Sequence, residues 1–258
     1  MSLIKSELRK VLYVRANWGI LLASVVISII SVVITPFIFE AGNVGAGLTL
    51  DSPQAIDGVY ANAISGYIFV IILGIMLMAG EYRHGTAVAT FLARPKREIV
   101  LAAKLGIAAI VGAVFMLISV WASIFAGIIV LATFDNAAAP SSGTFLNLTI
   151  AGLVSGAILA VIGVAIGALL KSQMLAIVFS LVYLFVIDPL LLVLWVDIAK
   201  YLPGGLITAM TAIDIDAPEF GINTANFLDP IQATLVLLGY GAVFALMSLV
   251  TSMRRDVE

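Results

Sequence analysis

The sequence predicts an all-α polytopic membrane protein with six transmembrane helices. The prediction depends on the composition, on six long apolar runs, and on the distribution of charge between those runs. Of the 258 residues, 62% are hydrophobic and 11% are charged, whereas a soluble domain is about 45–50% apolar and about 25% charged. An excess of apolar residues on this scale places most of the chain in lipid.

Each apolar run has close to the roughly 20 residues that a helix needs to cross a bilayer. We place the six runs near Trp18–Phe39, Tyr60–Ala79, Ile99–Thr133, Phe145–Leu170, Ser172–Val196 and Pro230–Met253. The third run is longer than one crossing requires, so we expect it to tilt or to begin as an interfacial helix. The first run is too long for a signal-peptide core, so we expect an uncleaved span.

The charges predict the orientation of the spans. With the N-terminus in the cytoplasm, twelve of the thirteen Lys and Arg residues fall on the cytoplasmic side, and only Lys200 falls outside. Cytoplasmic loops of membrane proteins carry such an excess of positive charge. An odd number of spans would place Arg254 and Arg255 on the wrong side, so six spans with both termini cytoplasmic are expected.

We expect one transmembrane domain over residues 1–258, because the connections are too short to hold a soluble domain. Residues 1–16 are amphipathic, with Ile4, Leu8, Val11 and Leu12 on one face, which is typical of a helix in the membrane surface. A solvated helix start is the alternative. Residues 40–59 contain turn-forming glycines and Pro53 and are expected to form an external loop.

Residues 80–98 are expected to form a cytoplasmic segment that contacts a separate protein. This segment separates two apolar runs, and residues 80–104 carry five of the Lys and Arg residues and the only histidine, His84. The apolar side chains of Phe91 and Leu92 need to be covered by lipid or by a partner. The alternative is a basic loop that only orients the protein.

Residues 188–229 are expected to form an external re-entrant hairpin and loop. Asp188-Pro189 interrupts the fifth run, and proline removes a backbone donor there. We expect Asp188 to cap a new helix that starts at Pro189, and two short helices to be separated by Pro203, Gly204 and Gly205. An acid within an apolar run is also a candidate functional residue, so both interpretations of Asp188 stay open.

The fourth run has small residues four positions apart, which lets helices approach closely in lipid. Gly152, Gly156, Gly163 and Gly167 lie on one face of this helix. The pattern predicts helix packing, against either another helix of this chain or a second copy.

The sequence lacks the residues of the common catalytic sites. No lysine follows a glycine, so no phosphate-binding loop is present and any ATP must bind to another chain. The single histidine lies in the cytoplasmic segment, away from Ser155, so a Ser–His pair is not expected. With one histidine and no cysteine, the usual zinc sites are not expected either. We expect no catalytic site and no cofactor in this chain.

Three stretches resemble the type-2 (ABC-2) permease subunits of bacterial ATP-binding-cassette exporters. They are the N-terminal SELRKVLYVRANW, the Gly80–Thr86 stretch GEYRHGT followed by Arg94–Arg97 and Lys104, and the Tyr201–Gly204 stretch YLPG. The resemblance implies a permease in a bacterial cell membrane that pairs with a second copy, as a homodimer, and with two cytoplasmic ATPase subunits, which bind ATP and Mg. It also implies a coupling helix at 80–98 and a gate in the external hairpin.

By this resemblance, two sets of residues have roles. The contact with the ATPase is expected at Glu81, Tyr82, Arg83, His84, Gly85, Thr86 and Phe91. The external gate is expected at Asp188, Pro189, Pro203, Gly204 and Gly205.

The predicted function is ATP-driven export of an apolar or amphipathic substrate such as a drug, lipid or peptide. The spans carry few polar groups, which favours such a substrate. One alternative is an ATP-independent carrier or channel, although carriers often have discontinuous helices in both halves and this sequence shows one interruption only. The other is a non-transporting immunity or sensor subunit. No nucleic-acid partner is expected.

Overall fold

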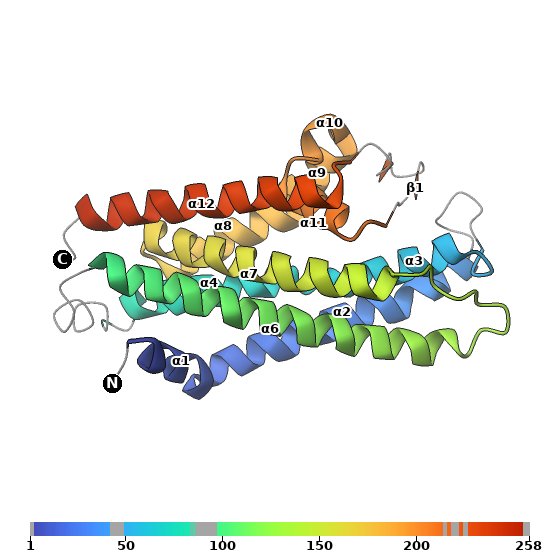
Figure 1. The fold of residues 1–258 in the computed structure, drawn as a ribbon, viewed down its shortest axis with the longest axis horizontal. Coiled ribbons are helices and arrows are strands. Elements are labelled where there is room, and N and C mark those ends of the chain that lie inside the picture. The colour runs from blue at the N-terminus through green and yellow to red at the C-terminus, as the bar shows by residue number, and fades with distance from the viewer. Residues whose placement is uncertain are drawn as a thin grey trace.

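Long helices lie roughly side by side along the long axis of the molecule (Figure 1). The computed structural model describes residues 3–41, 49–83, 85, 97–213, 216–217, 222–223 and 227–254. Within these residues the α-helices are α1 (Leu3–Tyr13), α2 (Arg15–Glu40), α3 (Pro53–Ala61), α4 (Tyr67–Arg83), α6 (Arg97–Leu131), α7 (Thr144–Leu170), α8 (Gln173–Val182), α9 (Asp188–Leu194), α10 (Val196–Ala199), α11 (Pro203–Met210) and α12 (Pro230–Arg254). The remaining elements are a 3-10 turn η1 (Asn62–Ile64), a π-helical turn η2 (Tyr183–Ile187), and an antiparallel pair of two-residue strands, β1 (Asp216–Ala217) and β2 (Ile222–Asn223).

Six helical segments in the described part of the chain are long and apolar enough to cross a membrane. They are Arg15–Glu40, Pro53–Arg83, Ile99–Leu131, Thr144–Leu170, Gln173–Leu194 and Pro230–Val250. The six predicted runs are therefore confirmed as helices. The long third run forms one continuous helix of 35 residues, α6, which spans about 52 Å at 1.5 Å per residue.

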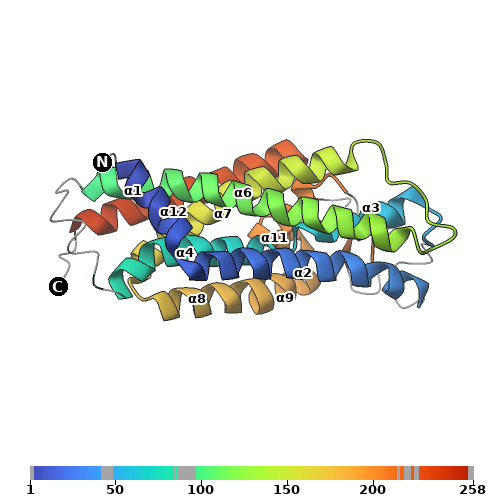
Figure 2. The same cartoon turned by 90° about the horizontal axis from the view of Figure 1, so that it is seen from below.

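The core of the bundle is formed by α4 and α7. In these two spans, 61% and 67% of the residues in the most apolar window are buried, against 22% in α2, 17% in α8–α9 and 22% in α12. Figures 1 and 2 show α2, α6, α8 and α12 around the central pair. The outer helices present many exposed apolar side chains, which is the expected surface of a protein in lipid.

Different helices lie at the two ends of the bundle. We name one the α1 end, because α1 lies there with the end of α4, the start of α6 and the end of α12 (Figure 1). We name the other the α11 end, because it holds α3 and α9–α11 (Figure 1). This arrangement agrees with an even number of crossings.

The second span is interrupted, which the sequence analysis did not predict. Helix α3 starts at Pro53, where the Ser52 hydroxyl caps it by accepting the Ala55 N–H at 3.3 Å. The predicted loop over 40–59 is therefore wrong for residues 53–59, because a serine cap and a proline at the first helical position start a helix there. The helix then breaks between η1 and α4, around Ser65 and Gly66, so the expectation of a single interruption in the chain is also wrong.

The predicted hairpin contains three short helices in place of two. The break precedes Pro203, which begins α11, because proline fits the first helical position. Asp188 has a helical backbone, with φ −63° and ψ −50°. An N-cap residue needs a non-helical backbone, so the prediction that Asp188 caps its own helix is wrong.

Helix α1 contacts the bundle through a side that the sequence analysis did not single out. Glu7 and Val11 are buried, whereas Ile4, Leu8 and Leu12 of the predicted apolar face are exposed. Val11 therefore belongs to the protein-facing side. The remaining apolar side chains face away from the bundle, as in a helix that lies in a membrane surface.

Candidate functional site

The predicted coupling residues begin at the last turn of α4. Glu81 is buried, Tyr82 is half-buried, and Arg83 and Gly85 are exposed. Gly85 ends the helix with a φ of +66°, a backbone conformation that favours glycine, and its N–H donates to the Tyr82 carbonyl at 3.3 Å. His84, Thr86 and Phe91, together with the predicted helix around Phe91, lie outside the described residues.

Glu81 belongs to a cluster of four charged side chains at the α1 end, which we name the ion cluster: Glu7, Lys10, Glu81 and Lys104. The Lys104 Nζ lies 2.6 Å from Glu7 Oε2 and 2.7 Å from Glu81 Oε1. The Lys10 Nζ lies 2.6 Å from Glu7 Oε1 and 2.6 Å from Glu81 Oε1. The cluster has two positive and two negative charges, and it joins α1, α4 and α6.

Three of the four side chains in the ion cluster, those of Glu7, Glu81 and Lys104, are buried, whereas the Lys10 side chain is 44% exposed. The Lys104 side chain is only 2% exposed, and a charge taken out of water is stable only when opposite charges surround it. Loss of one partner leaves an uncompensated charge, at a cost of about 3–5 kcal/mol. Glu81 therefore faces the interior of this chain, while Arg83 faces outward two positions later.

The two members of the cluster on α1 have shifted acid–base properties. Burial acts to raise the pKa of the Glu7 carboxyl, but the ammonium groups of Lys104 and Lys10 outweigh burial and hold this pKa below its ordinary value. Burial acts to lower the pKa of Lys10, but hydrogen bonds to Glu7 and Glu81 outweigh it and raise this pKa. Both shifts favour the charged forms that the cluster needs.

A groove lies beside the end of α4, next to the point where the predicted coupling segment leaves the bundle. It has a volume of about 620 Å³ and is lined by Tyr82, Arg83 and residues 171–174, 177 and 178. Its far wall is the turn between α7 and α8, where Lys171 takes a φ of 51° and Ser172 caps α8. A tight turn at Lys171–Ser172 thus joins α7 to α8. The Arg83 Nη1 donates to Gln173 Oε1 at 3.5 Å across the groove.

The glycines of the fourth run pack within this chain. A Cβ on Gly163 would lie 2.2 Å from the Ile71 carbonyl oxygen of α4, and one on Gly156 would lie 2.6 Å from the Gly112 carbonyl oxygen of α6. A Cβ on Gly167 would lie 3.0 Å from the Ile75 carbonyl oxygen, and one on Gly152 would lie 2.9 Å from Val120. The partner helices are therefore α4 and α6, rather than a second copy.

Serine side chains support the break in the second span. The Gly66 N–H donates to Ser28 Oγ at 3.0 Å, and the Gly66 carbonyl accepts from Ser24 Oγ at 3.2 Å. Ser24 also lies 2.8 Å from Ser119 Oγ of α6. An interrupted helix within a membrane needs such partners for its freed backbone groups.

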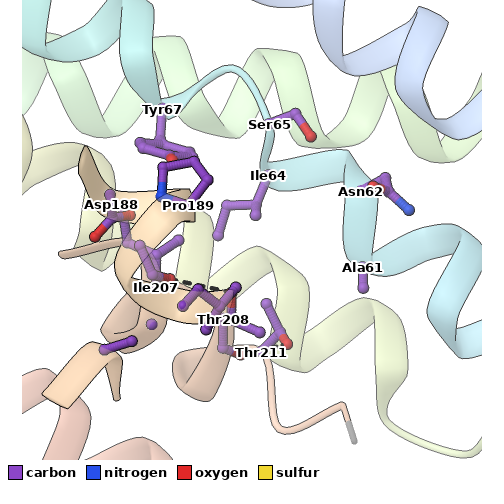
Figure 3. A pocket seen from close by; sticks show the side chains of 14 residues that line it. Ala61, Asn62, Ile64, Ser65, Tyr67, Asp188, Pro189, Ile207, Thr208 and Thr211 are labelled. Atoms are coloured by element: carbon purple, nitrogen blue, oxygen red, sulfur yellow. Dashed lines mark hydrogen bonds between the residues drawn. The ribbon is translucent and has the colours of Figure 1, made fainter. Parts of the chain in front are cut away.

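The structure brings the predicted gate residues to the α11 end, around a polar cavity (Figure 3). Asp188, Pro189, Gly204 and Gly205 line this cavity, which has a volume of about 240 Å³, whereas Pro203 lines a separate apolar cavity. The glycines permit close contacts, because a Cβ on Gly204 would lie 1.8 Å from Asp188 Oδ2 and one on Gly205 would lie 2.2 Å from the Ala199 carbonyl oxygen. The opposite wall is the interrupted second span.

The partners of both predicted sites could not be predicted from the sequence. Glu7 and Lys104 complete the ion cluster, and the only local signal was the spacing of Glu7 and Lys10 by three positions on a helix. Asn62 and Ser65 complete the polar cavity. Their signal was the Ser65-Gly66 pair within an apolar run, which marks a possible turn.

These features define a polytopic helical membrane protein with interrupted helices at one end and a buried charge cluster at the other. Residues 3–187, which are 185 of the 258 residues, match the family described as ABC-2 family transporter protein. The chain therefore belongs to the ABC-2 transporter membrane family, whose members are transport components in the membrane. The matched segment ends at Ile187, so α9–α12 lie beyond it. A search of curated proteins found no match.

Proposed function

We propose that this chain is the permease subunit of an ATP-driven exporter, and that the ion cluster connects a separate ATPase to the helix bundle. Family membership supports the permease role. The ion cluster carries the rest of the proposal, because it fixes the base of the predicted coupling segment to two other helices through Glu81. A force on residues 84–96 then reaches α1 and α6 together.

The proposed contact surface includes the exposed Arg83 and the groove beside it. Tyr82 and Arg83 line this groove and Gly85 lies just beyond, so three of the predicted coupling residues lie at one surface of the α1 end. Glu81 acts from inside the bundle in this proposal. His84, Thr86 and Phe91 complete the predicted contact.

The remaining parts of the proposal come from the charge distribution and the family. The α1 end faces the cytoplasm of a bacterial cell, two copies pair as a homodimer, and each copy recruits one ATPase subunit that binds ATP and Mg. The exposed apolar face of α1 lies in the membrane surface. The substrate is apolar or amphipathic, and the hairpin at 188–229 controls the outer exit.

Arg83→Ala tests the contact surface. The full chain, tagged and purified from membranes of its own host, is expected to retain an ATP-binding-cassette ATPase, and Arg83→Ala is expected to retain about tenfold less, as for the loss of one well-placed charge. Arg15→Ala is the matched control, because Arg15 is an exposed arginine at the same end. Normal retention by Arg83→Ala, or equal losses in both variants, would show that this surface is not the contact.

One observation favours a second function, that of an ATP-independent carrier. Two interrupted spans meet at one polar cavity, and secondary carriers often bind substrate between discontinuous helices. Transport in vesicles that lack any ATPase, and that collapses with the ion gradient, would favour the carrier. Transport that requires the ATPase and ATP supports the exporter.

A further inference from the structure

We propose that the α11 end contains a binding site for an amphipathic molecule with one cationic amine, with the amine at Asp188 and the apolar part in a neighbouring cavity. This inference rests on the proposed function, since it identifies the class of substrate that the permease would take. The site consists of two adjoining cavities with different linings.

The first cavity is the polar one in Figure 3, of about 240 Å³. Its polar side chains are those of Asn62, Ser65, Tyr67, Asp188, Thr208 and Thr211. Among the described residues of this lining, Asp188 is the only charged one, and it is 8% exposed. Its carboxylate lies against the Gly204 backbone, where a Cβ would come within 1.8 Å of Asp188 Oδ2.

No basic side chain of the described residues forms a salt bridge with Asp188. Lys200 is the only basic residue between 172 and 253, and its Nζ lies 3.5 Å from Asp197. A carboxylate held away from water is costly without an opposite charge. A ligand cation supplies that charge, whereas the same carboxylate repels an anion.

The second cavity has about 220 Å³ and an almost wholly apolar lining, which includes Ile71, Leu159, Phe179 and Phe244. Ser180 also lines it, is 4% exposed, and has a hydroxyl without a partner among the described residues. This cavity is a suitable place for a hydrocarbon group. Ser180 gives it one point at which a polar atom of the ligand can bond.

The two cavities are one helical turn apart on two different elements. Tyr67 lines the polar cavity and Ile71 the apolar one, four residues further along α4. Likewise, Leu184 in η2 lines the apolar cavity, and Asp188, four residues later at the start of α9, lines the polar one. One turn of a helix rises about 5.4 Å. In this proposal one molecule occupies both, and together their volumes reach the roughly 300–1,000 Å³ of small-molecule sites.

The neighbouring apolar cavity decides between an organic cation and a metal ion. A divalent ion takes six or more oxygen ligands and usually more than one carboxylate, and in the part of the lining that the structure describes Asp188 is the only carboxylate. A bare monovalent ion would leave the apolar cavity without a role. Octylamine has one amine and an apolar chain of matching size, so it is the probe.

The test is equilibrium binding of radiolabelled octylamine to the full chain in nanodiscs, with empty nanodiscs subtracted. Asp188→Asn keeps the shape and removes the charge, and we expect it to weaken octylamine binding by about tenfold or more while octanol binding is unchanged. Asp197→Asn is the matched control, because Asp197 is an acid of the same hairpin whose side chain is 97% exposed. It is expected to leave both affinities unchanged.

Two further variants test each cavity with the charge retained. Ser65→Leu fills the polar cavity and is expected to weaken octylamine and ethylamine binding, even if Asp188→Asn does not fold. Ile71→Phe fills the apolar cavity and is expected to weaken octylamine and octanol binding but not ethylamine binding.

The inference is overturned if octylamine does not bind the unaltered chain, or if Asp188→Asn and Asp197→Asn have equal effects. It is also overturned if K⁺ displaces octylamine as effectively as ethylamine does. Since binding needs no ATP and no partner, it can fail while the ATPase contact stands.

Discussion

The two ends of the bundle differ in whether their buried charged side chains have partners of opposite charge. At the α1 end, two acids and two bases satisfy one another at 2.6–2.7 Å and join three helices. At the α11 end, the buried Asp188 lies in a cavity that has no base among its described lining residues. A closed cluster holds helices together and transmits movement, whereas an acid in an open cavity is available to a ligand. In our proposal, the α1 end therefore connects the bundle to the ATPase, and the α11 end binds the ligand.

The largest expected effect comes from opening the ion cluster. Lys104→Met leaves Glu7 and Glu81 with Lys10 alone, and we expect the free energy of unfolding to fall by about 3–5 kcal/mol. Unfolding in mixed micelles with a denaturing detergent measures this change. Lys200→Met is the control at the other end, and because its partner Asp197 has a side chain that is 97% exposed we expect a change below about 1 kcal/mol.

A double variant separates the charge from the packing of Lys104. Glu81→Gln with Lys104→Met removes one charge of each sign and is expected to recover most of the lost stability, since neutral replacements of buried ion pairs are often tolerated. A double variant that is no more stable than Lys104→Met would contradict the assignment of these side chains to one electrostatic cluster.

The next effect concerns the helix contacts that connect the two ends. Gly163→Ala places a Cβ 2.2 Å from a backbone oxygen of α4, so the helices must separate, and we expect a loss of about 1–3 kcal/mol. Gly239→Ala is the control in α12, where a Cβ would meet nothing within 4 Å. It is expected to be neutral or stabilising by up to about 1 kcal/mol. Equal losses in the same unfolding experiment would contradict the close packing of α7.

The smallest effect is the response of α1 to pH. Glu7 has a lowered pKa, so its contribution to holding α1 is present above its ordinary value of 4.5 and is lost as pH falls through the value in the folded chain. Lys10 has a raised pKa, so its contribution is present below 10.5 and is lost as pH rises through the higher folded value. We therefore expect α1 to stay attached at neutral pH and to loosen at both extremes.

A spin label on α1 measures this release. The chain has no cysteine, so Ile4→Cys gives a single labelling site on the exposed face of α1. The mobility of the label is expected to rise at acidic and at strongly alkaline pH but not between them. In the Glu81→Gln and Lys104→Met double variant the release is expected nearer to neutral pH.

The spans could be predicted from the sequence because a helix that crosses a bilayer needs a run of about 20 apolar residues. Such a run is visible in the local composition. The glycine face of α7 was equally visible, because it depends on spacing within one helix. Its partners were not, since α4 and α6 come together only in the folded chain. Lys104 was recognisable as a basic residue near a span end, but its burial depends on Glu7, 97 residues away.

The α11 end shows the same limit. Asp188-Pro189 marked an interruption correctly, but the local pattern of an acid before a proline pointed to a cap on its own helix. In the fold the carboxylate lies instead against Gly204 of α11. The break at Gly66 was hidden because its backbone partners, Ser24 and Ser28, lie about 40 residues earlier in α2.

The central claim is the proposal that the ion cluster connects the ATPase to the helix bundle. It predicts that ATP moves the α11 end, and one distance measurement tests this. Gln54→Cys in α3 and Ile198→Cys in α10 are exposed sites on two helices that border the polar cavity. Electron paramagnetic resonance measures the distance between labels at these sites in the complex with the ATPase, with and without trapped ATP. We predict a change with ATP in the otherwise unaltered chain and none in the Glu81→Gln and Lys104→Met double variant. No change in the former, or the same change in both, would contradict the claim.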